Sequence, residues 1–277
     1  MTTKFFPLFL CLALPFATHG AVPLTEAVFS QVIKDVNVVN VDTRESTKAK
    51  LGDTFKNPNV IRTGPDSLAE LMAPDKTVTR VGANTAFSFE KSGRAINLEE
   101  GSVLFHSPKG KGGGTIRTKG ASAAVLGTTL VVTATDGGGF KAIVLEGKGQ
   151  ITLPNGDFRV LTAGQVTFVL PGARTFGPQL NINLSKLVEN SRLVQGFEKE
   201  LPSKPIIQIE IDRQIKQINT GQFEDTKKLV VNSQTKDTVT TVDSTVLQEA
   251  VKVMEPRTRD VTLTTSSFGD YANQLLL

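Results

Sequence analysis

The chain has 277 residues, enough for one large domain or two small ones, and its 39% apolar and 21% charged residues are ordinary for a globular protein. Its 31 Lys and Arg residues are interspersed with 27 Asp and Glu residues, so no basic patch indicates a nucleic-acid partner, and we expect none. The single cysteine, Cys11, lies in the apolar start of the chain, which excludes a fold that depends on disulfides.

The first twenty residues have the pattern of a secretory signal peptide. Lys4 precedes an apolar run from Phe5 to Ala17, and small residues at 18–21 allow cleavage after Gly20. The run is shorter than the roughly 20 apolar residues that a membrane helix needs, although a retained anchor is the alternative. We therefore expect a signal peptide over 1–20 and an exported protein, periplasmic or extracellular, with no membrane span in the mature chain.

Residues 35–172 have a β pattern. Short stretches rich in Val, Ile, Thr and Phe alternate with turn signals roughly every eight to twelve residues, which is typical of an all-β sandwich, barrel or solenoid. The predicted strands include 68–73, 86–89, 102–105, 129–133, 142–145 and 166–169.

A weak internal repeat places glycines at the predicted turns. Residues 96–103 resemble 160–166, and 144–147 are a shortened copy; each copy indicates a strand, a glycine turn and a strand. Glycine is favoured at such turns because it reaches positive φ at little cost. The predicted turn glycines are Gly64, Gly101, Gly127, Gly147 and Gly164.

The pattern becomes helical over residues 183–221. Apolar residues recur from Leu184 to Leu201, and Pro202 would stop this first helix. Pro205 is a suitable first residue for a second helix, although apolar residues at 207, 209 and 211 also permit a strand. The apolar stripe predicted for this helix consists of Ile207, Ile211, Ile215 and Ile218. Residues 222–277 are polar and predict an extended or disordered tail.

The chain contains few residues suited to catalysis or metal binding. His106 is the one histidine outside the predicted signal peptide, so neither a catalytic triad nor a zinc site has enough members, and we interpret it as a strand-end residue. Glu99 and Glu100 are adjacent, and we expect them to point to different sides as solvated residues. We predict no catalytic residue, no metal site and no cofactor.

The glycine-rich stretch SPKGKGGGTIRT, residues 107–118, invites comparison with a phosphate-binding loop. Three glycines follow Lys111, which breaks the Gly-Lys-Thr order, and Thr115–Thr118 has the pattern of a strand rather than a helix. We therefore predict a long, mobile hairpin connection. Its basic residues could still contact a partner, and the candidates are Lys109, Lys111, Arg117 and Lys119.

Several stretches, taken in order, resemble the FecR domain over roughly residues 35–170. The matching stretches are 60–71 with 79–85, 96–103, 116–132, 144–147 and 161–165. The resemblance implies an all-β, solenoid-like domain on the outer side of a bacterial cytoplasmic membrane. In the regulators that name the family, this domain is not an enzyme. It relays a signal from an outer-membrane receptor to a cytoplasmic segment that controls a sigma factor.

This sequence departs from that architecture at two points. Four residues precede the apolar run, so we expect no cytoplasmic anti-sigma segment, and Leu126 stands where many relatives have an arginine. Our first hypothesis is therefore a non-catalytic, exported FecR-domain protein that binds or scaffolds an unknown envelope protein or polymer. One alternative is a signalling component that acts in trans with a membrane protein. A hydrolase of envelope polysaccharide or peptide is another.

Overall fold

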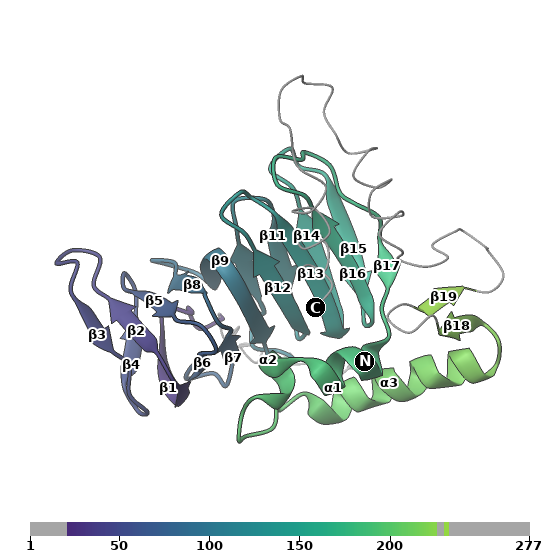
Figure 1. Ribbon diagram of the computed structural model, residues 1–277, viewed down its shortest axis with the longest axis horizontal. Coiled ribbons are helices and arrows are strands. Elements are labelled where there is room, and N and C mark those ends of the chain that lie inside the picture. The colour runs from purple at the N-terminus through teal and green to yellow at the C-terminus, as the bar shows by residue number, and fades with distance from the viewer. Residues whose placement is uncertain (1–20, 226–229, 233–277) are drawn as a thin grey trace, which may run out of the picture.

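The computed structural model describes residues 21–225 and 230–232 (Figure 1). Strands fill the chain from Glu26 to Asn181, and three helices follow. This arrangement confirms the predicted fold class, a mainly β domain followed by helices. The predicted signal peptide lies outside the described residues, as does most of the predicted tail.

The strands are, in chain order, β1 Glu26–Ile33, β2 Val36–Val39, β3 Ser46–Lys48, β4 Thr54–Lys56, β5 Val60–Thr63, β6 Leu68–Met72, β7 Val78–Val81, β8 Ala86–Phe89, β9 Ala95–His106, β10 Gly114–Arg117, β11 Ser122–Val125, β12 Thr129–Ala134, β13 Phe140–Glu146, β14 Lys148–Thr152, β15 Phe158–Thr162, β16 Gln165–Val169 and β17 Leu180–Asn181. The helices are α1 Leu184–Asn190, α2 Arg192–Gln195 and α3 Lys204–Asn219. Strands β18 Phe223–Asp225 and β19 Val230–Asn232 form a separate antiparallel pair inside the predicted tail.

The strands up to β17 form two sheets that share β9. Sheet A has the order β4-β1-β6-β7-β9-β12-β13-β16-β17. Sheet B has the order β3-β2-β5-β8-β9-β10-β11-β14-β15. Residues 95–100 of β9 belong to sheet B and residues 101–106 to sheet A, so this strand passes from one sheet into the other.

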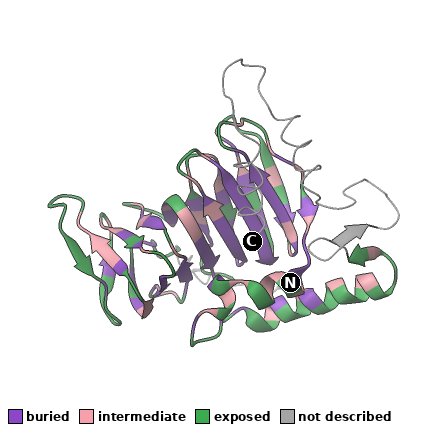
Figure 2. Ribbon diagram, in the orientation of Figure 1, coloured by how far each residue is buried: buried purple, intermediate pink, exposed green. Residues whose placement is uncertain are grey.

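Strands of sheet A carry buried residues on both faces, because sheet B packs on one face and the helical segment packs on the other. Phe105, Val132 and Val144 point inward to the core between the sheets, whose first half is filled by four phenylalanine rings with neighbouring centroids 5.2–6.2 Å apart. Their chain neighbours point outward to a second cluster that includes residues of the helices. Alternation along each strand therefore supplies two cores at once. Figure 2 shows buried residues running along these strands.

The glycines mark the corners where the chain passes from one sheet to the other. Gly127, Gly147 and Gly164 have φ values of 65°, 80° and 79°, which confirms their predicted conformation. Gly64 also lies at a corner but has no positive φ; its Cα faces Asp35, whose side chain lies 3.1 Å from where a Cβ would stand. Gly101 has the predicted positive φ, 91°, but it does not separate two strands, because β9 continues through it and bends there into sheet A.

The helical segment differs from the prediction in two details. The first predicted helix is interrupted, since Ser191 is extended (φ −76°, ψ 117°) and separates α1 from α2. The second predicted helix is confirmed as α3, with Pro205 in its first turn. Ile215 is 43% exposed instead of joining the buried stripe. Eight residues at 3.6 per turn place Ile215 about 80° around the helix from the buried Ile207.

Candidate binding site

A groove of about 380 Å³ lies between α3 and two of the glycine corners. Gly147 and Ala163 form its floor, α3 forms one wall, and Phe223 of β18 lies at its edge. Its polar lining residues are Lys148, Thr162, Gln165, Asn181, Glu210, Arg213, Gln214 and Gln217. The groove is thus rich in side-chain amides, which can both donate and accept hydrogen bonds.

Gln214 fixes α3 over the corner. Its Nε2 donates to the backbone oxygen of Ile182 at 2.8 Å, and its Oε1 accepts from the backbone N–H of Leu184 at 2.9 Å. A Cβ on Gly164 would lie 3.1 Å from that Nε2. Glycine at residue 164 therefore allows the helix to approach closely, and it also allows the positive φ of the turn.

The charges in the groove are only partly balanced. Glu210 is the one carboxylate among the lining residues, and it forms an ion pair with Arg213. Lys148, on the opposite wall, forms no ion pair with any described residue. The lining therefore lacks the two facing carboxylates that a glycosidase uses, and it offers hydrogen-bonding groups with one free cation.

A buried polar cluster joins the base of α3 to sheet A. The Thr129 hydroxyl lies 2.8 Å from His106 Nδ1, 2.7 Å from Glu146 Oε1 and 2.8 Å from the hydroxyl of Ser203. These residues come from β9, β12, β13 and the residue that precedes α3. Three neighbouring strands are thereby tied to the start of the helix by one hydroxyl.

Burial shifts both titratable members of this cluster. It lowers the pKa of His106, because the charged imidazolium is poorly solvated there. It also raises the pKa of Glu146, a change that the Thr129 hydrogen bond and the charge of Lys109 oppose. The Thr129 and Ser203 side chains are fully buried, so neither hydroxyl is open to a substrate. The cluster is a polar connection within the fold, and a lone histidine at a strand end gave no signal of it.

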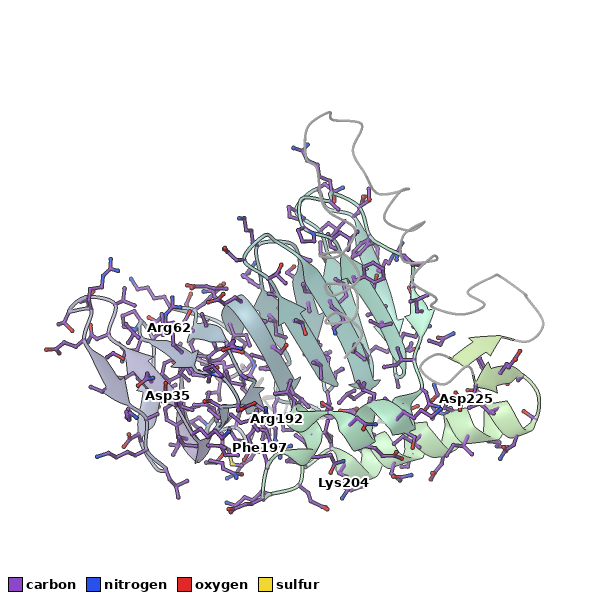
Figure 3. The ribbon with its side chains drawn as sticks, in the orientation of Figure 1. Asp35, Arg62, Arg192, Phe197, Lys204 and Asp225 are labelled. Carbon is purple, nitrogen blue, oxygen red and sulfur yellow. The ribbon has the colours of Figure 1, made fainter. Side chains whose placement is uncertain are left out.

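A second buried connection holds the segment around α2 on the other half of sheet A. Arg80 is fully buried, and its Nε donates to Glu70 Oε2 at 2.7 Å. Its NH1 donates to the backbone oxygens of Leu193 and Val194 at 3.1 and 2.9 Å. The ring of Phe197, which is labelled in Figure 3, stacks on the guanidinium with its centroid 4.3 Å away. Sequence reasoning missed this connection, because its partners are more than a hundred residues apart.

Asp66 adds an exposed contact to the same segment. Its carboxylate pairs with Lys34 Nζ at 3.3 Å and with Arg192 NH1 at 3.2 Å. The hydrogen bond and charge of Lys34, followed by the charge of Arg192, lower the pKa of Asp66. Asp66 has a positive φ of 55°, as a turn residue after Gly64 can have.

The four basic residues predicted as partner contacts are not brought together. Lys109 packs on Gly127 at one end of β11, and Lys119 lies in the turn at the other end, with its Nζ 3.3 Å from the backbone oxygen of Asp136. Arg117 is paired with Glu90 at 2.7 Å. Lys111 lies in the loop before β10, as Lys109 does. Their contact with a partner stays a prediction.

The loop that contains these lysines is not a hairpin. β10 pairs in parallel with residues 95–97, the first part of β9. The loop therefore carries the chain back to the start of β9 in sheet B, instead of turning at the end of β9 to form an antiparallel pair. Arg94 Nε donates to the backbone oxygen of Gly113 at 2.7 Å, and a Cβ on Gly112 would lie 2.2 Å from that of Ala21. These glycines thus allow close packing against the N-terminal segment, and the predicted hairpin is wrong.

Glu99 and Glu100 also differ from expectation. Both are exposed as predicted, but both lie beside the Arg62 guanidinium, at 3.6 and 3.7 Å, and so do not point to different sides. The pairing of β8 with β9 is irregular here, with Ala86 opposite Glu100 and Phe87 opposite Leu98. That bulge breaks the alternation on which the prediction depended.

The described residues contain neither a clustered set of metal ligands nor a helix suited to span a membrane. No cluster of three or more His, Cys, Asp or Glu side chains among them has the arrangement of a metal site. None of the helices found between residues 21 and 232 combines the length and the apolarity that crossing a bilayer requires.

Two solved structures are similar to part of this chain. Two solved structures, each described as a "putative anti-sigma factor" from Parabacteroides distasonis, share 20% and 16% identity with this chain, with TM-scores of 0.40 and 0.39. The first alignment covers 44% of this chain and 59% of that structure, and the second covers 62% and 97%. This chain therefore spans about three fifths of the first structure. A search of curated proteins found no match.

A family model gives the more specific result. The model described as FecR protein matches residues 59–148, which run from just before β5 to the first residue of β14. The matched stretch contains β9, the Arg80–Glu70 pair and three members of the buried cluster, His106, Thr129 and Glu146. The resemblance drawn from the sequence is thereby confirmed over residues 59–148, which match the FecR family model.

Proposed function

We propose that this protein is a non-catalytic FecR-domain module that is exported and binds a protein partner in a cell-surface signalling system. The FecR match over residues 59–148 carries the proposal, since the FecR family is regulatory. Fold and function are separable, so the contact itself has to be argued from the surface of this chain.

The groove at α3 offers a contact site for such a partner. The Gln217 amide and the Asn181 Nδ2 have no hydrogen bond to a described residue and suit the C=O and N–H groups of an extended peptide, and Phe223 supplies an aromatic anchor at the rim. Lys148, whose charge no described residue balances, favours a segment that carries an acidic residue, and Arg213 beside it is already paired with Glu210. The groove joins the FecR domain to α3, so a bound segment would contact both.

Site-specific cross-linking tests the partner contact. A photoreactive residue at Gln217, on the groove wall, should capture one protein in cells, whereas the same residue at the exposed Asp42 should not. Arg213→Glu combined with Phe223→Ala should abolish the adduct. Asp212→Arg, an exposed charge change one residue away on α3, is the matched control and should leave it intact. Equal capture from both positions would contradict a contact at the groove.

Two further measurements test signalling and export. A strain that lacks the gene should show a changed transcript profile, which the wild type and Asp212→Arg restore and the double groove variant does not. An unchanged profile in the deletion strain would overturn the signalling role.

The intact mass of the purified protein should correspond to a chain that begins at Ala21, and retention of residues 1–20 would contradict cleavage.

A further inference from the structure

The end of the β domain opposite α3 carries a second hollow, of about 390 Å³. Three hairpin turns meet there: 118–121 between β10 and β11, 135–139 between β12 and β13, and 153–157 between β14 and β15. The chain after β16, residues 171–174, completes the rim. We call this hollow the loop cup, and Figure 1 shows that these turns lie away from the helices.

Glycines build the walls of the loop cup. A Cβ on Gly120 would lie 2.1 Å from the backbone oxygen of Gly138, so these two turns are in direct backbone contact. Gly137 faces Pro171, which lies 3.2 Å from the place of its Cβ, and Gly172 has a positive φ of 75°. Without side chains at these positions the hollow stays open, and backbone polar groups form much of its surface.

The charge of the loop cup has one sign. Lys119 and Arg174 line it, and none of its lining residues is a carboxylate. Neither cation forms an ion pair with a described residue; the Lys119 amine contacts only the backbone oxygen of Asp136. The nearby Asp157 is held by Asn155, whose Nδ2 donates to its Oδ2 at 2.8 Å. Two cations therefore face one hollow without a counter-charge from the protein.

The remaining lining complements a small polar ligand. The Asn155 amide is bonded to Asp157 and to the backbone oxygen of Arg174, so backbone groups of the glycine turns supply the hydrogen-bonding partners, while Leu153, Pro154 and Ala173 supply an apolar patch. A volume of this size lies at the small end of the range for ligand pockets. Such a mixture suits a sugar-sized molecule, whose ring has apolar faces and whose hydroxyls form hydrogen bonds, provided that it also carries an anionic group.

We propose that the loop cup binds a small anionic ligand of sugar size, whose carboxylate or phosphate pairs with Lys119 and Arg174. The proposal is independent of the α3 groove, because the two hollows lie at opposite ends of the strands β12 to β15 and share no lining residue. Lys119 was among the basic residues that the sequence suggested for a partner contact, and Arg174 was not.

Titration calorimetry at low salt tests the loop cup with three probes: galacturonic acid, inorganic phosphate and neutral galactose. At least one anion should bind with a Kd of about 1 mM, and galactose should not bind detectably. Binding of galacturonic acid alone would identify a carboxylate, and binding of phosphate alone would identify a phosphate. Lys119→Ser and Arg174→Ser should each weaken the bound anion about tenfold, as loss of a charge-assisted hydrogen bond does.

Lys91→Ser is the matched control, since Lys91 is an exposed lysine in a hairpin turn of the other half of the domain. It should bind the anion as the wild type does, and all three variants should keep the wild-type Tm. The proposal fails if neither anion binds at about 10 mM. It also fails if the variant that combines Lys119→Ser with Arg174→Ser binds the anion as tightly as Lys91→Ser does, or if galactose binds as tightly as the anions.

Discussion

The two halves of the β domain, β1 to β8 and β10 to β17 with β9 between them, change sheets mainly at opposite ends. In the first half the chain crosses from sheet to sheet near Gly64 and Gly82, beside residues 101–103 of β9. In the second half it crosses at Gly127, Gly147 and Gly164, at the end of sheet A where Thr129 lies opposite His106. The hairpin turns lie at the other end in each half, where the first half also has one crossing, from β4 to β5 through residues 57–59. The same strand–glycine–strand sequence therefore builds two units of opposite polarity.

The reversal follows from β9 and the loop after it. β9 runs through both sheets, and the loop 107–113 then carries the chain back to sheet B, where β10 pairs in parallel with the start of β9. This is the one parallel pairing among the described strands. As a result, α3 covers the corners of the second half. The hairpin turns of that half lie at the opposite end, where no described helix covers them. The α3 groove and the loop cup are consequences of that one change of direction.

The first prediction concerns the buried pair that fastens the first half to the helical segment. Arg80→Met should lower the free energy of unfolding by about 3–5 kcal/mol, because Glu70 is left buried without its cation and three backbone oxygens lose a donor. Urea denaturation measures this. Adding Glu70→Leu should recover part of the loss, since the isolated charge is then gone. A cost below about 1 kcal/mol for Arg80→Met would show that the pair is not a major anchor.

The second prediction concerns Lys141, on the outer face of sheet A in the second half. It lies opposite Thr133 and Phe168, and no described residue gives its amine a hydrogen bond or an ion pair. Burial lowers its pKa to about 8, below the ordinary value of 10.5. Lys141→Met should therefore stabilise the protein at pH 7, by up to about 3 kcal/mol if the whole shift is recovered.

The pH dependence gives Lys141 a specific signature. Between pH 8 and 10.5 the unfolded chain binds a proton at this residue that the folded protein has lost. The stability of the wild type should therefore rise with pH across this interval, and that of Lys141→Met should not. Arg117→Met, at an exposed and ion-paired position, is the control. Parallel stability curves for the wild type and Lys141→Met would contradict a buried, unpaired amine.

The third prediction compares a corner with a hairpin turn. Gly147 and Gly156 both have positive φ, 80° and 93°, so alanine is strained at each. At Gly147 a Cβ would also lie 2.8 Å from Thr128 Oγ1 and 3.1 Å from the backbone oxygen of Gly127, whereas nothing lies within 4 Å at Gly156. Gly156→Ala should cost about 1 kcal/mol and Gly147→Ala about 2–3 kcal/mol. Equal costs would mean that corners are no tighter than hairpin turns.

These comparisons also show what the sequence could and could not predict. Local signals identified the strands, the positive φ of Gly127, Gly147 and Gly164, and the start of α3 at Pro205. They could not distinguish a corner from a hairpin turn, because that depends on which strand each segment pairs with. The pairing of β10 with β9 turned the expected hairpin at 107–118 into a return to sheet B.

The site residues were hidden for the same reason. Arg80 meets Leu193, and Thr129 meets Ser203, only after the helices fold back on sheet A. Neither pair leaves a local pattern such as a fixed spacing. The sequence predicted one of the two cations of the loop cup, since Lys119 was named for its charge. Arg174 lies in a turn 55 residues later, and no motif connects it to Lys119.

The smallest expected effect concerns His106, in the cluster under α3. Burial lowers its pKa, so the unfolded chain binds more protons than the folded protein as the pH falls through the ordinary value of 6.5. His106 should therefore make the protein less stable on acidification from pH 7 to 5, and His106→Gln should remove that part of the loss. Tm measured across this interval reports the difference.

Glu146 provides an internal check, because its contribution has the opposite sign. Burial raises its pKa, so the folded protein binds the extra proton, and acidification through that range favours folding. Glu146→Gln should therefore make the wild-type loss of stability toward pH 5 steeper, while His106→Gln makes it shallower. If both variants changed the slope in the same direction, the two groups would not titrate independently around the Thr129 hydroxyl. The cluster would then have to be treated as one coupled pair across Thr129.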